Sequence, residues 1–166
     1  MNIVLIGYRG TGKSSVAKIL GARLQRLVVS TDEEIVRRAG RSVPEIVAQH
    51  GWDHFRDLES AVCRDVAARD GLVIDTGGGA ILRPENVAAL KAGGKLFWLT
   101  AEVATIAARI GGDTQRPSLT GTKSFVEEIA DVLDERRPQY AAAADVVIAT
   151  DGRSLAEIAD AILAAR

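Results

Sequence analysis

The segment from Gly7 to Ser14 constrains the fold more than any other part of this chain. It reads Gly-Tyr-Arg-Gly-Thr-Gly-Lys-Ser and matches the pattern G-x-x-x-x-G-K-[ST] in full. A strand-like apolar run ends at Ile6, and an amphipathic helical pattern begins near Gly12. A chance glycine turn would not explain both the pattern and its position. A strand, a glycine-rich loop and a helix in this order predict a βα unit that wraps around phosphate groups.

The chemistry of phosphate binding requires these residue types. Glycines let the loop curl so that successive N–H groups face the phosphates. The helix N-terminus adds a field that favours negative charge. We expect Lys13 to reach the β- and γ-phosphates and the Ser14 hydroxyl to ligate Mg²⁺, the expected cofactor. The residues expected to bind ATP in this loop are Gly10, Thr11, Gly12, Lys13, Ser14 and Ser15.

Short apolar runs alternate with segments of helical spacing along the chain. The runs are rich in β-branched residues and suit strands that are buried on both faces. They cover residues 3–6, 27–29, 72–74, 96–99 and 146–148. Helix starts are indicated by Ser-x-x-Glu patterns at Ser42, Ser124 and Ser154 and by Pro84. The alternation predicts a three-layer α/β domain with a mostly parallel sheet.

The composition fits a single globular domain over residues 1–166. Apolar residues make up 47% of the chain and charged residues 26%, which argues against disorder along most of it. A formal net charge of -1 leaves no basic excess to attract nucleic acid or an acidic membrane surface. The apolar run at 3–6 is too short for a signal peptide or a membrane span. Cys63, the single cysteine, excludes an internal disulfide and suits a small buried side chain in the reduced cytosol. We therefore expect a cytoplasmic monomer that binds neither nucleic acid nor membrane.

Five further segments narrow the class of protein. They are Ser30-Thr31-Asp32, Phe55-Arg56-Asp57-Leu58-Glu59, Thr76-Gly77-Gly78-Gly79-Ala80, Gln115-Arg116-Pro117-Ser118-Leu119 and Arg136-Arg137-Pro138-Gln139-Tyr140. Each is weak alone, but their order and spacing behind the phosphate loop are specific. Together they resemble the shikimate kinase family over essentially the whole chain.

The resemblance implies a P-loop fold of the nucleoside-monophosphate-kinase type. Such a fold is a three-layer α/β domain with a five-stranded parallel sheet in the order 2-3-1-4-5, flanked by helices. The implied reaction is transfer of the γ-phosphoryl group of ATP to the 3-hydroxyl of shikimate, in aromatic amino-acid biosynthesis. The implied partners are the small molecules ATP and shikimate. An acceptor-binding region is expected at about residues 31–60 and a lid at about 111–123.

The resemblance also implies roles for residues outside the phosphate loop. It implies that Asp32 binds ring hydroxyls, and it leaves open whether Asp32 also accepts the proton. It implies that Arg56 and Arg136 hold the carboxylate, and that the backbone at Gly78 and Gly79 approaches the substrate.

Three arginines are expected to serve the nucleotide. The resemblance implies that Arg116 in the lid contacts the phosphates and forms the catalytic set with Lys13 and Asp32. It implies that Arg109 and Arg153 lie near the adenine.

Several of these residues have a structural alternative. Arg116, in a glycine-rich loop, could be a solvated surface residue. Asp32 could cap a helix. Arg56 could pair with Glu59 on the surface, a contact worth only ~0.2–0.5 kcal/mol. Arg136 could serve a helix dipole. The three glycines could form a plain turn, although glycines directly after a buried strand more often allow a close approach to the backbone.

Three other residues are expected to have structural roles. Asp75 ends the third apolar run and has the position of a Walker-B carboxylate, but the family does not depend on one there. We therefore interpret it as structural or as supporting the site indirectly. His50 and His54 lack a carboxylate in register and are interpreted as surface residues rather than zinc ligands.

One departure from the family pattern concerns the metal. The family usually has Asp-x-Asp where this chain has Ser30-Thr31-Asp32, and the first aspartate commonly supports the Mg²⁺ shell. Ser30 is neutral and shorter, and Ser30-x-x-Glu33 also forms a capping-box pattern. The departure places the metal affinity in question more than the identity of the substrate.

Two other functions remain as alternatives. A P-loop kinase for a different small hydroxy acid would share the phosphate loop and would differ in its acceptor. A non-catalytic nucleotide-binding module would bind MgATP without turnover. Ser30 is the one feature that favours the second alternative, and the set Lys13, Ser14, Asp32 and Arg116 argues against it.

Overall fold

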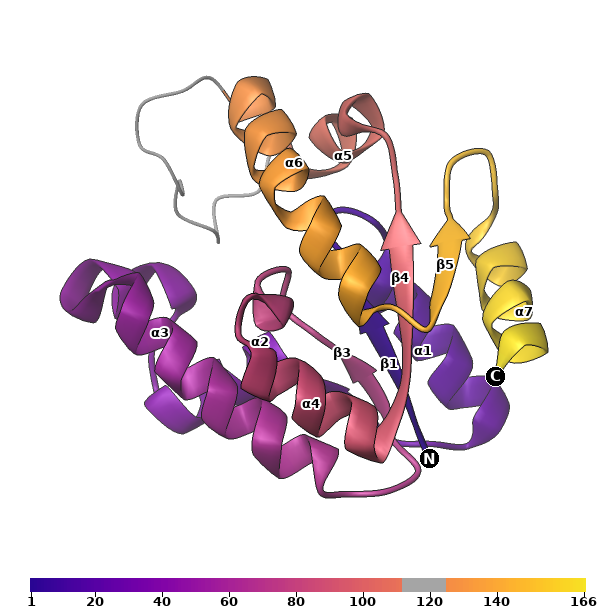
Figure 1. The fold of residues 1–166 in the computed structure, drawn as a ribbon, viewed down its shortest axis with the longest axis horizontal. Coiled ribbons are helices and arrows are strands. Elements are labelled where there is room, and N and C mark those ends of the chain that lie inside the picture. The colour runs from indigo at the N-terminus through magenta and orange to yellow at the C-terminus, as the bar shows by residue number, and fades with distance from the viewer. Residues whose placement is uncertain (112–124) are drawn as a thin grey trace.

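The computed structural model describes residues 1–111 and 125–166, with the backbone alone at Phe125. Five parallel strands form one sheet in the order β2-β3-β1-β4-β5 (Figure 1). The strands are β1 (Asn2–Ile6), β2 (Val28–Ser30), β3 (Val73–Asp75), β4 (Gly94–Thr100) and β5 (Val146–Ala149). This topology confirms the predicted fold class.

Helices cover both faces of the sheet. In chain order they are α1 (Lys13–Leu24), α2 (Thr31–Ala39), α3 (Val43–Ala67), the 3₁₀ turn η1 (Ala80–Leu82), α4 (Pro84–Gly93), α5 (Val103–Ile110), α6 (Phe125–Ala143) and α7 (Leu155–Ala165). Helices α1 and α7 pack on the face to which Ile3 and Leu5 of β1 point. Helices α2 to α6 pack toward the other face, to which Val4 and Ile6 point. The alternation along one buried strand thus divides the core into two apolar layers.

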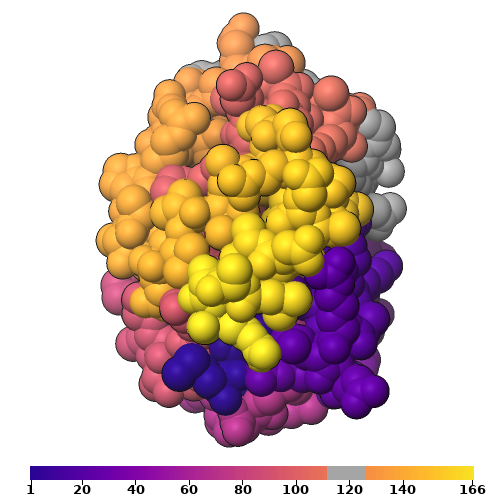
Figure 2. Space-filling view, turned by 90° about the vertical axis from the view of Figure 1, so that its right-hand side faces the viewer, coloured from indigo at the N-terminus to yellow at the C-terminus, as the bar shows by residue number. Residues whose placement is uncertain are grey.

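The pairing of α1 with α7 closes one side of the molecule. Figure 2 shows the yellow segment that contains α7 packed against the purple segment that contains α1. Val16 and Leu20 of α1 are fully buried there with Ile162 of α7. This packing fixes α1, whose N-terminus follows the phosphate loop directly.

The predicted helix starts hold where the structure describes them. Ser42 and Ser154 form complete capping boxes with Glu45 and Glu157, and Pro84 occupies the first turn of α4. At the start of α2 the backbone N–H of Glu33 donates to Ser30 Oγ at 3.2 Å, which is one half of the predicted box. The pattern at Ser124, the lid expected from Gly112 on and Arg116 lie outside the described residues.

All five strands extend past the apolar runs that predicted them, and the ends of β2 and β3 matter most for the site. The expected ranges 27–29 and 72–74 become Val28–Ser30 and Val73–Asp75. A prediction from hydrophobicity ends each strand at its last apolar residue. The backbone hydrogen bonds that define a strand can continue through a polar residue. Ser30 and Asp75 therefore lie opposite each other in the β2–β3 register.

No helix in the described part of the chain is long and apolar enough to cross a membrane. Cys63 lies on α3 and faces the apolar core of the domain, as predicted, and its side chain is fully buried. Burial raises the pKa of its thiol to about 12, and the negative charges of Glu59 and Asp32 act in the same direction.

We predict that Cys63 is inert to alkylation in the native protein. A pKa of about 12 leaves on the order of a thousandfold less thiolate than an ordinary cysteine has at pH 8. Iodoacetamide labelling, followed by mass spectrometry, should therefore be slower by at least that factor in buffer than in denaturing urea. Since the chain has one cysteine, the label reports on this site alone. Equal rates in the two solvents would contradict the buried placement.

Candidate active site

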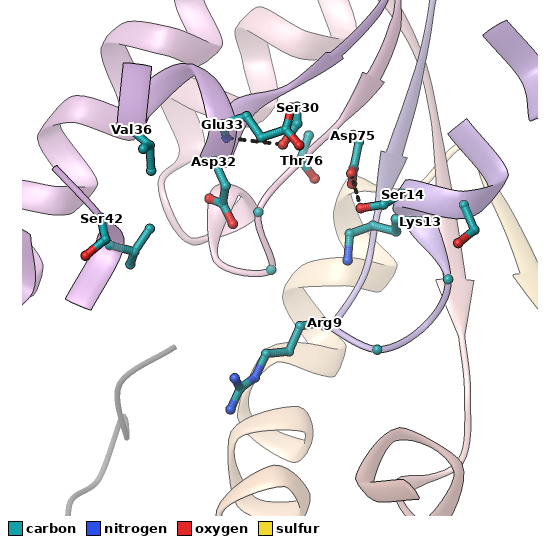
Figure 3. A pocket seen from close by; sticks show the side chains of 16 residues that line it. Arg9, Lys13, Ser14, Ser30, Asp32, Glu33, Val36, Ser42, Asp75 and Thr76 are labelled. Carbon is teal, nitrogen blue, oxygen red and sulfur yellow. Dashed lines mark hydrogen bonds between the residues drawn. The ribbon is translucent and has the colours of Figure 1, made fainter. Parts of the chain in front are cut away.

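A cleft of about 580 Å³ opens at the carboxyl ends of β1, β2 and β3. Its walls are the loop after β1, the first turn of α2 and the loop after β3 (Figure 3). Parallel strands all end at the same edge of a sheet, so three segments far apart in the sequence meet there. This is the position at which the sequence predicted its ligands.

The phosphate loop has the expected conformation. Gly10 and Gly12 have φ angles of 81° and 94°, a left-handed backbone that favours glycine. Lys13 Nζ donates to the carbonyl oxygens of Gly7 at 2.8 Å and of Tyr8 at 3.0 Å. Thr11 Oγ1 donates to the Tyr8 carbonyl at 2.8 Å. The loop thus holds its shape through its own side chains, with Lys13 lying along its inner side.

The Ser14 hydroxyl has a carboxylate partner. Ser14 Oγ donates to Asp75 Oδ2 at 2.6 Å, and both residues line the cleft. Burial raises the pKa of the Asp75 carboxyl, and the nearby charges of Asp32 and Glu33 raise it further, whereas Lys13 and the bond from Ser14 oppose the rise. This bond agrees with the interpretation of Asp75 as structural or as supporting the site indirectly, and only the fold shows that β3 ends beside Ser14.

Asp32 lies on the opposite wall of the cleft, in the first turn of α2 (Figure 3). The N-cap of this helix is Ser30, so the capping alternative for Asp32 does not hold. Thr31, next to it, is fully buried, and its Oγ1 accepts a hydrogen bond from Gly77 N at 2.9 Å. That bond ties the start of α2 to the loop after β3.

Arg56 forms a buried ion pair rather than the surface contact that the sequence left open. Arg56 Nη1 lies 2.8 Å from Glu59 Oε1, and the Glu59 side chain has no exposed surface. The guanidinium also lies 5.3 Å from the ring centroids of Trp52 and Phe55. A buried carboxylate and two aromatic rings therefore fix the position of Arg56.

The glycines after β3 leave room for these side chains. A methyl group on Gly79 would lie 2.3 Å from Arg56 Nη1, and one on Gly77 would lie 2.5 Å from Asp32 Oδ1. A methyl group on Gly78 would lie 3.5 Å from Arg136 Nη1. Asp32, Arg56 and Arg136, which come from three different helices, thus converge on one glycine loop. A plain turn would not require that closeness.

Arg136 is buried on α6, one turn before Tyr140. The Tyr140 hydroxyl donates to the Gly78 carbonyl, and its ring stacks on Trp98 with centroids 5.5 Å apart. Burial raises the pKa of Tyr140 to about 12, although the charge and hydrogen bond of Arg136 oppose the rise. The R-x-P-x-Y frame therefore places two side chains of α6 on the glycine loop.

The remaining predicted residues differ in their placement. Arg109 Nη1 donates to the Gly10 carbonyl at 3.1 Å, which joins α5 to the phosphate loop. Arg153 is exposed on the turn between β5 and α7, and its side chain makes no hydrogen bond with the described residues. His50 and His54 are exposed on α3, as predicted. No three His, Cys, Asp or Glu side chains within residues 1–111 and 125–166 gather as a metal site.

Sequence reasoning missed Arg9. Its side chain extends from the phosphate loop and lines the cleft (Figure 3). The residue occupies a free position of the G-x-x-x-x-G-K-[ST] pattern, so the motif carried no signal for it. Glu59 was likewise read only as a partner for Arg56, because its burial depends on how α3 packs.

Comparisons with known proteins agree with this geometry. The family model for shikimate kinase matches residues 9–165. A shikimate kinase of Nitratidesulfovibrio vulgaris is 47% identical over 90% of this chain and 86% of its own length. The chain belongs to the shikimate kinase family. Among solved structures, shikimate kinase from Acinetobacter baumannii in complex with shikimate superposes with a TM-score of 0.93 at 33% identity, covering 98% of this chain and 90% of that one. Shikimate kinase from Aquifex aeolicus superposes with a TM-score of 0.85 at 30% identity, covering 99% and 95% of the two chains.

We predict that the Tyr140 hydroxyl stabilises this member of the shikimate kinase family. Tyr140→Phe keeps the ring on Trp98 but leaves the buried Gly78 carbonyl without its donor, which should lower the free energy of unfolding by ~1–2 kcal/mol. Urea unfolding followed by circular dichroism would measure the loss.

Tyr8→Phe is the matched control for that experiment. The Tyr8 hydroxyl is also buried, but it has no hydrogen-bond partner in the described part of the chain. Its removal should leave the free energy of unfolding unchanged or raise it. If both variants lost the same stability, the bond to Gly78 would not be the cause.

Proposed function

We propose that this site transfers the γ-phosphoryl group of ATP to the 3-hydroxyl of shikimate, giving shikimate 3-phosphate for aromatic amino-acid biosynthesis. One observation carries the proposal for the site. Arg56, Arg136 and Asp32 converge on the glycine loop after β3. Asp32 and the glycines Gly77 and Gly78 of that loop line the same cleft as the phosphate loop. A compact acid with ring hydroxyls matches that set of charges.

The acceptor is held by groups from separate helices. Arg56 on α3 and Arg136 on α6 both reach the glycine loop, and a guanidinium is the natural bidentate partner of a carboxylate. Glu59 already neutralises one positive charge, so the site favours a single negative charge on the substrate. Asp32 on the opposite wall suits the hydroxyl groups, which donate to a carboxylate.

The nucleotide is held by the phosphate loop. Its backbone N–H groups and the N-terminus of α1 favour the phosphates. Lys13 would exchange its bonds with the carbonyls of Gly7 and Tyr8 for phosphate oxygens. Arg109 is anchored at the loop, Arg153 is proposed to reach the adenine from its exposed turn, and Arg116 is proposed to contact the transferred group.

The residues present fit a Mg²⁺ ion. The cleft offers the Ser14 hydroxyl and the carboxylates of Asp75, Asp32 and Glu33, which are hard oxygen donors. Ser14 would ligate the ion, with the remaining positions left to phosphates and water, as Mg²⁺ prefers. When bound, Mg²⁺ neutralises charge on the β- and γ-phosphates.

In phosphoryl transfer the protein forms no covalent bond with the transferred group in this proposal. The bond from the γ-phosphorus to the bridging oxygen breaks, a bond to the acceptor hydroxyl oxygen forms, and the hydroxyl proton leaves. Asp32 orients that hydroxyl, and we propose that it also takes the proton. Lys13 and the loop amides meet the charge that develops on the phosphoryl oxygens. Most of the rate enhancement is then positioning and electrostatics. That this happens in a cytoplasmic monomer, with residues 1–166 as one domain, stays a prediction.

Replacing Arg136 should separate the two substrates. We expect Arg136→Ala to raise the dissociation constant for shikimate by about 10- to 100-fold, the loss of one charge-assisted contact. The dissociation constant for MgATP should change little, because Arg136 lies against the glycine loop after β3, where we propose that the acceptor binds. Arg137→Ala is the control, since Arg137 is half exposed and pairs with Asp134 on the same helix. Isothermal titration with each ligand would measure this, and equal losses for both ligands in the Arg136 variant would contradict the assignment.

The acceptor itself is tested by coupled ADP release. With MgATP present, shikimate should stimulate ADP release far above the rate without an acceptor, and other hydroxy acids should not. Turnover with a different hydroxy acid alone would assign another kinase activity. Tight MgATP binding with no ADP formed in the presence of shikimate would assign a non-catalytic module.

A further inference from the structure

A carboxylate lies directly across the sheet from the neutral Ser30. Ser30 and Asp75 are opposite each other in the parallel register of β2 and β3, each as the last residue of its strand. Both line the cleft. Ser30 Oγ already accepts a hydrogen bond from Glu33 N as the N-cap of α2. Of these two paired residues at the strand ends, only Asp75 of β3 carries a negative charge.

Asp75 is also directly connected to the metal-binding hydroxyl. Its Oδ2 accepts the hydrogen of Ser14 Oγ at 2.6 Å (Figure 3). A hydroxyl that donates its hydrogen to a carboxylate keeps its lone pairs free to bind a cation. Asp75 is only 7% exposed and lines the cleft beside Ser14.

We propose that Asp75 takes the place of the missing carboxylate at position 30 and serves as the positioning residue for Mg²⁺. It orients the Ser14 hydroxyl and supplies negative charge beside the ion, while Ser30 serves α2 as a cap. Groups that orient a metal ligand in this way commonly set metal affinity.

A purely structural role for Asp75 explains less. A serine or asparagine at position 75 would accept the same bond from Ser14 without the cost of burying a charge. Asp32 and Glu33 line the same cleft and repel the Asp75 carboxylate. Lys13 and Arg9 line the cleft with these carboxylates. A divalent cation at Ser14 would add positive charge directly beside Asp75, the carboxylate bonded to that hydroxyl.

The test measures metal binding rather than turnover. Mn²⁺ replaces Mg²⁺, and its electron paramagnetic resonance signal reports free ion during titration of the protein–ADP complex. We expect Asp75→Asn to weaken Mn²⁺ binding by about tenfold or more. Metal-free ADP binding, followed by calorimetry in EDTA, should stay within about twofold, because the loop contacts persist. Asp65→Asn is the matched control, since Asp65 is half exposed on α3 and pairs with Arg38.

Moving the carboxylate from position 75 to position 30 should restore metal binding. The double variant Ser30→Asp with Asp75→Asn should recover most of the lost Mn²⁺ affinity, since aspartate also caps helices. Ser30→Asp alone keeps Asp75 in place, so it tests the proposal even if Asp75→Asn fails to fold. It should strengthen Mn²⁺ binding by no more than about threefold, because Asp75 already provides a carboxylate beside the metal site.

Three results would overturn the proposal. They are unchanged Mn²⁺ affinity in Asp75→Asn, an equal loss of metal-free ADP binding in that variant, or a gain of about tenfold or more in Ser30→Asp alone. The inference rests on the proposed function for the identity of the nucleotide site. The titration contains no shikimate, so failure of the acceptor assignment would leave its result unaffected.

Discussion

The hydrogen-bonded register of β3 between β1 and β2 is the constraint on which the site depends. Leu5 of β1 and Ser30 of β2 are both paired with Asp75. The loops that leave these three strands therefore start at one level, and the phosphate loop, the first turn of α2 and the glycine loop share one cleft. Shifting one strand by one residue would exchange the side chains that face the two apolar layers. The depth of apolar packing on both faces of β1 makes that shift costly.

Buried charge gives the cleft its rigidity. Lys13 is fixed by two loop carbonyls, Arg56 by Glu59, and Ser14 by Asp75. Lys13 and the Arg56–Glu59 pair are largely buried, where an unpaired charge would be strongly destabilising. Such groups are oriented before a ligand arrives, so little free energy is lost in reorganising them during phosphoryl transfer. The same packing explains Gly77 and Gly79 after β3, since the carboxylate of Asp32 and the guanidinium of Arg56 occupy the space that a side chain would need.

The sequence predicted correctly those features that depend on a few neighbouring residues. The phosphate loop, the capping boxes at Ser42 and Ser154 and the buried Cys63 each depend on a few neighbouring residues, and the structure has them as predicted. It fell short where burial decided the outcome. Arg56 and Glu59 at i, i+3 form the same pattern on a solvated helix as in a core. Strands were ended at their last apolar residue, which left out Ser30 and Asp75.

The sequence by itself determined the class of fold, the nucleotide loop and the family, because motif spacing and apolar periodicity are properties of the chain alone. Only the tertiary structure decided that Arg56 is buried, that Arg9 lines the cleft and that Asp75 reaches Ser14. Those facts arise from contacts between residues dozens of positions apart. Their partners are chosen by strand order and helix packing, which no local pattern encodes.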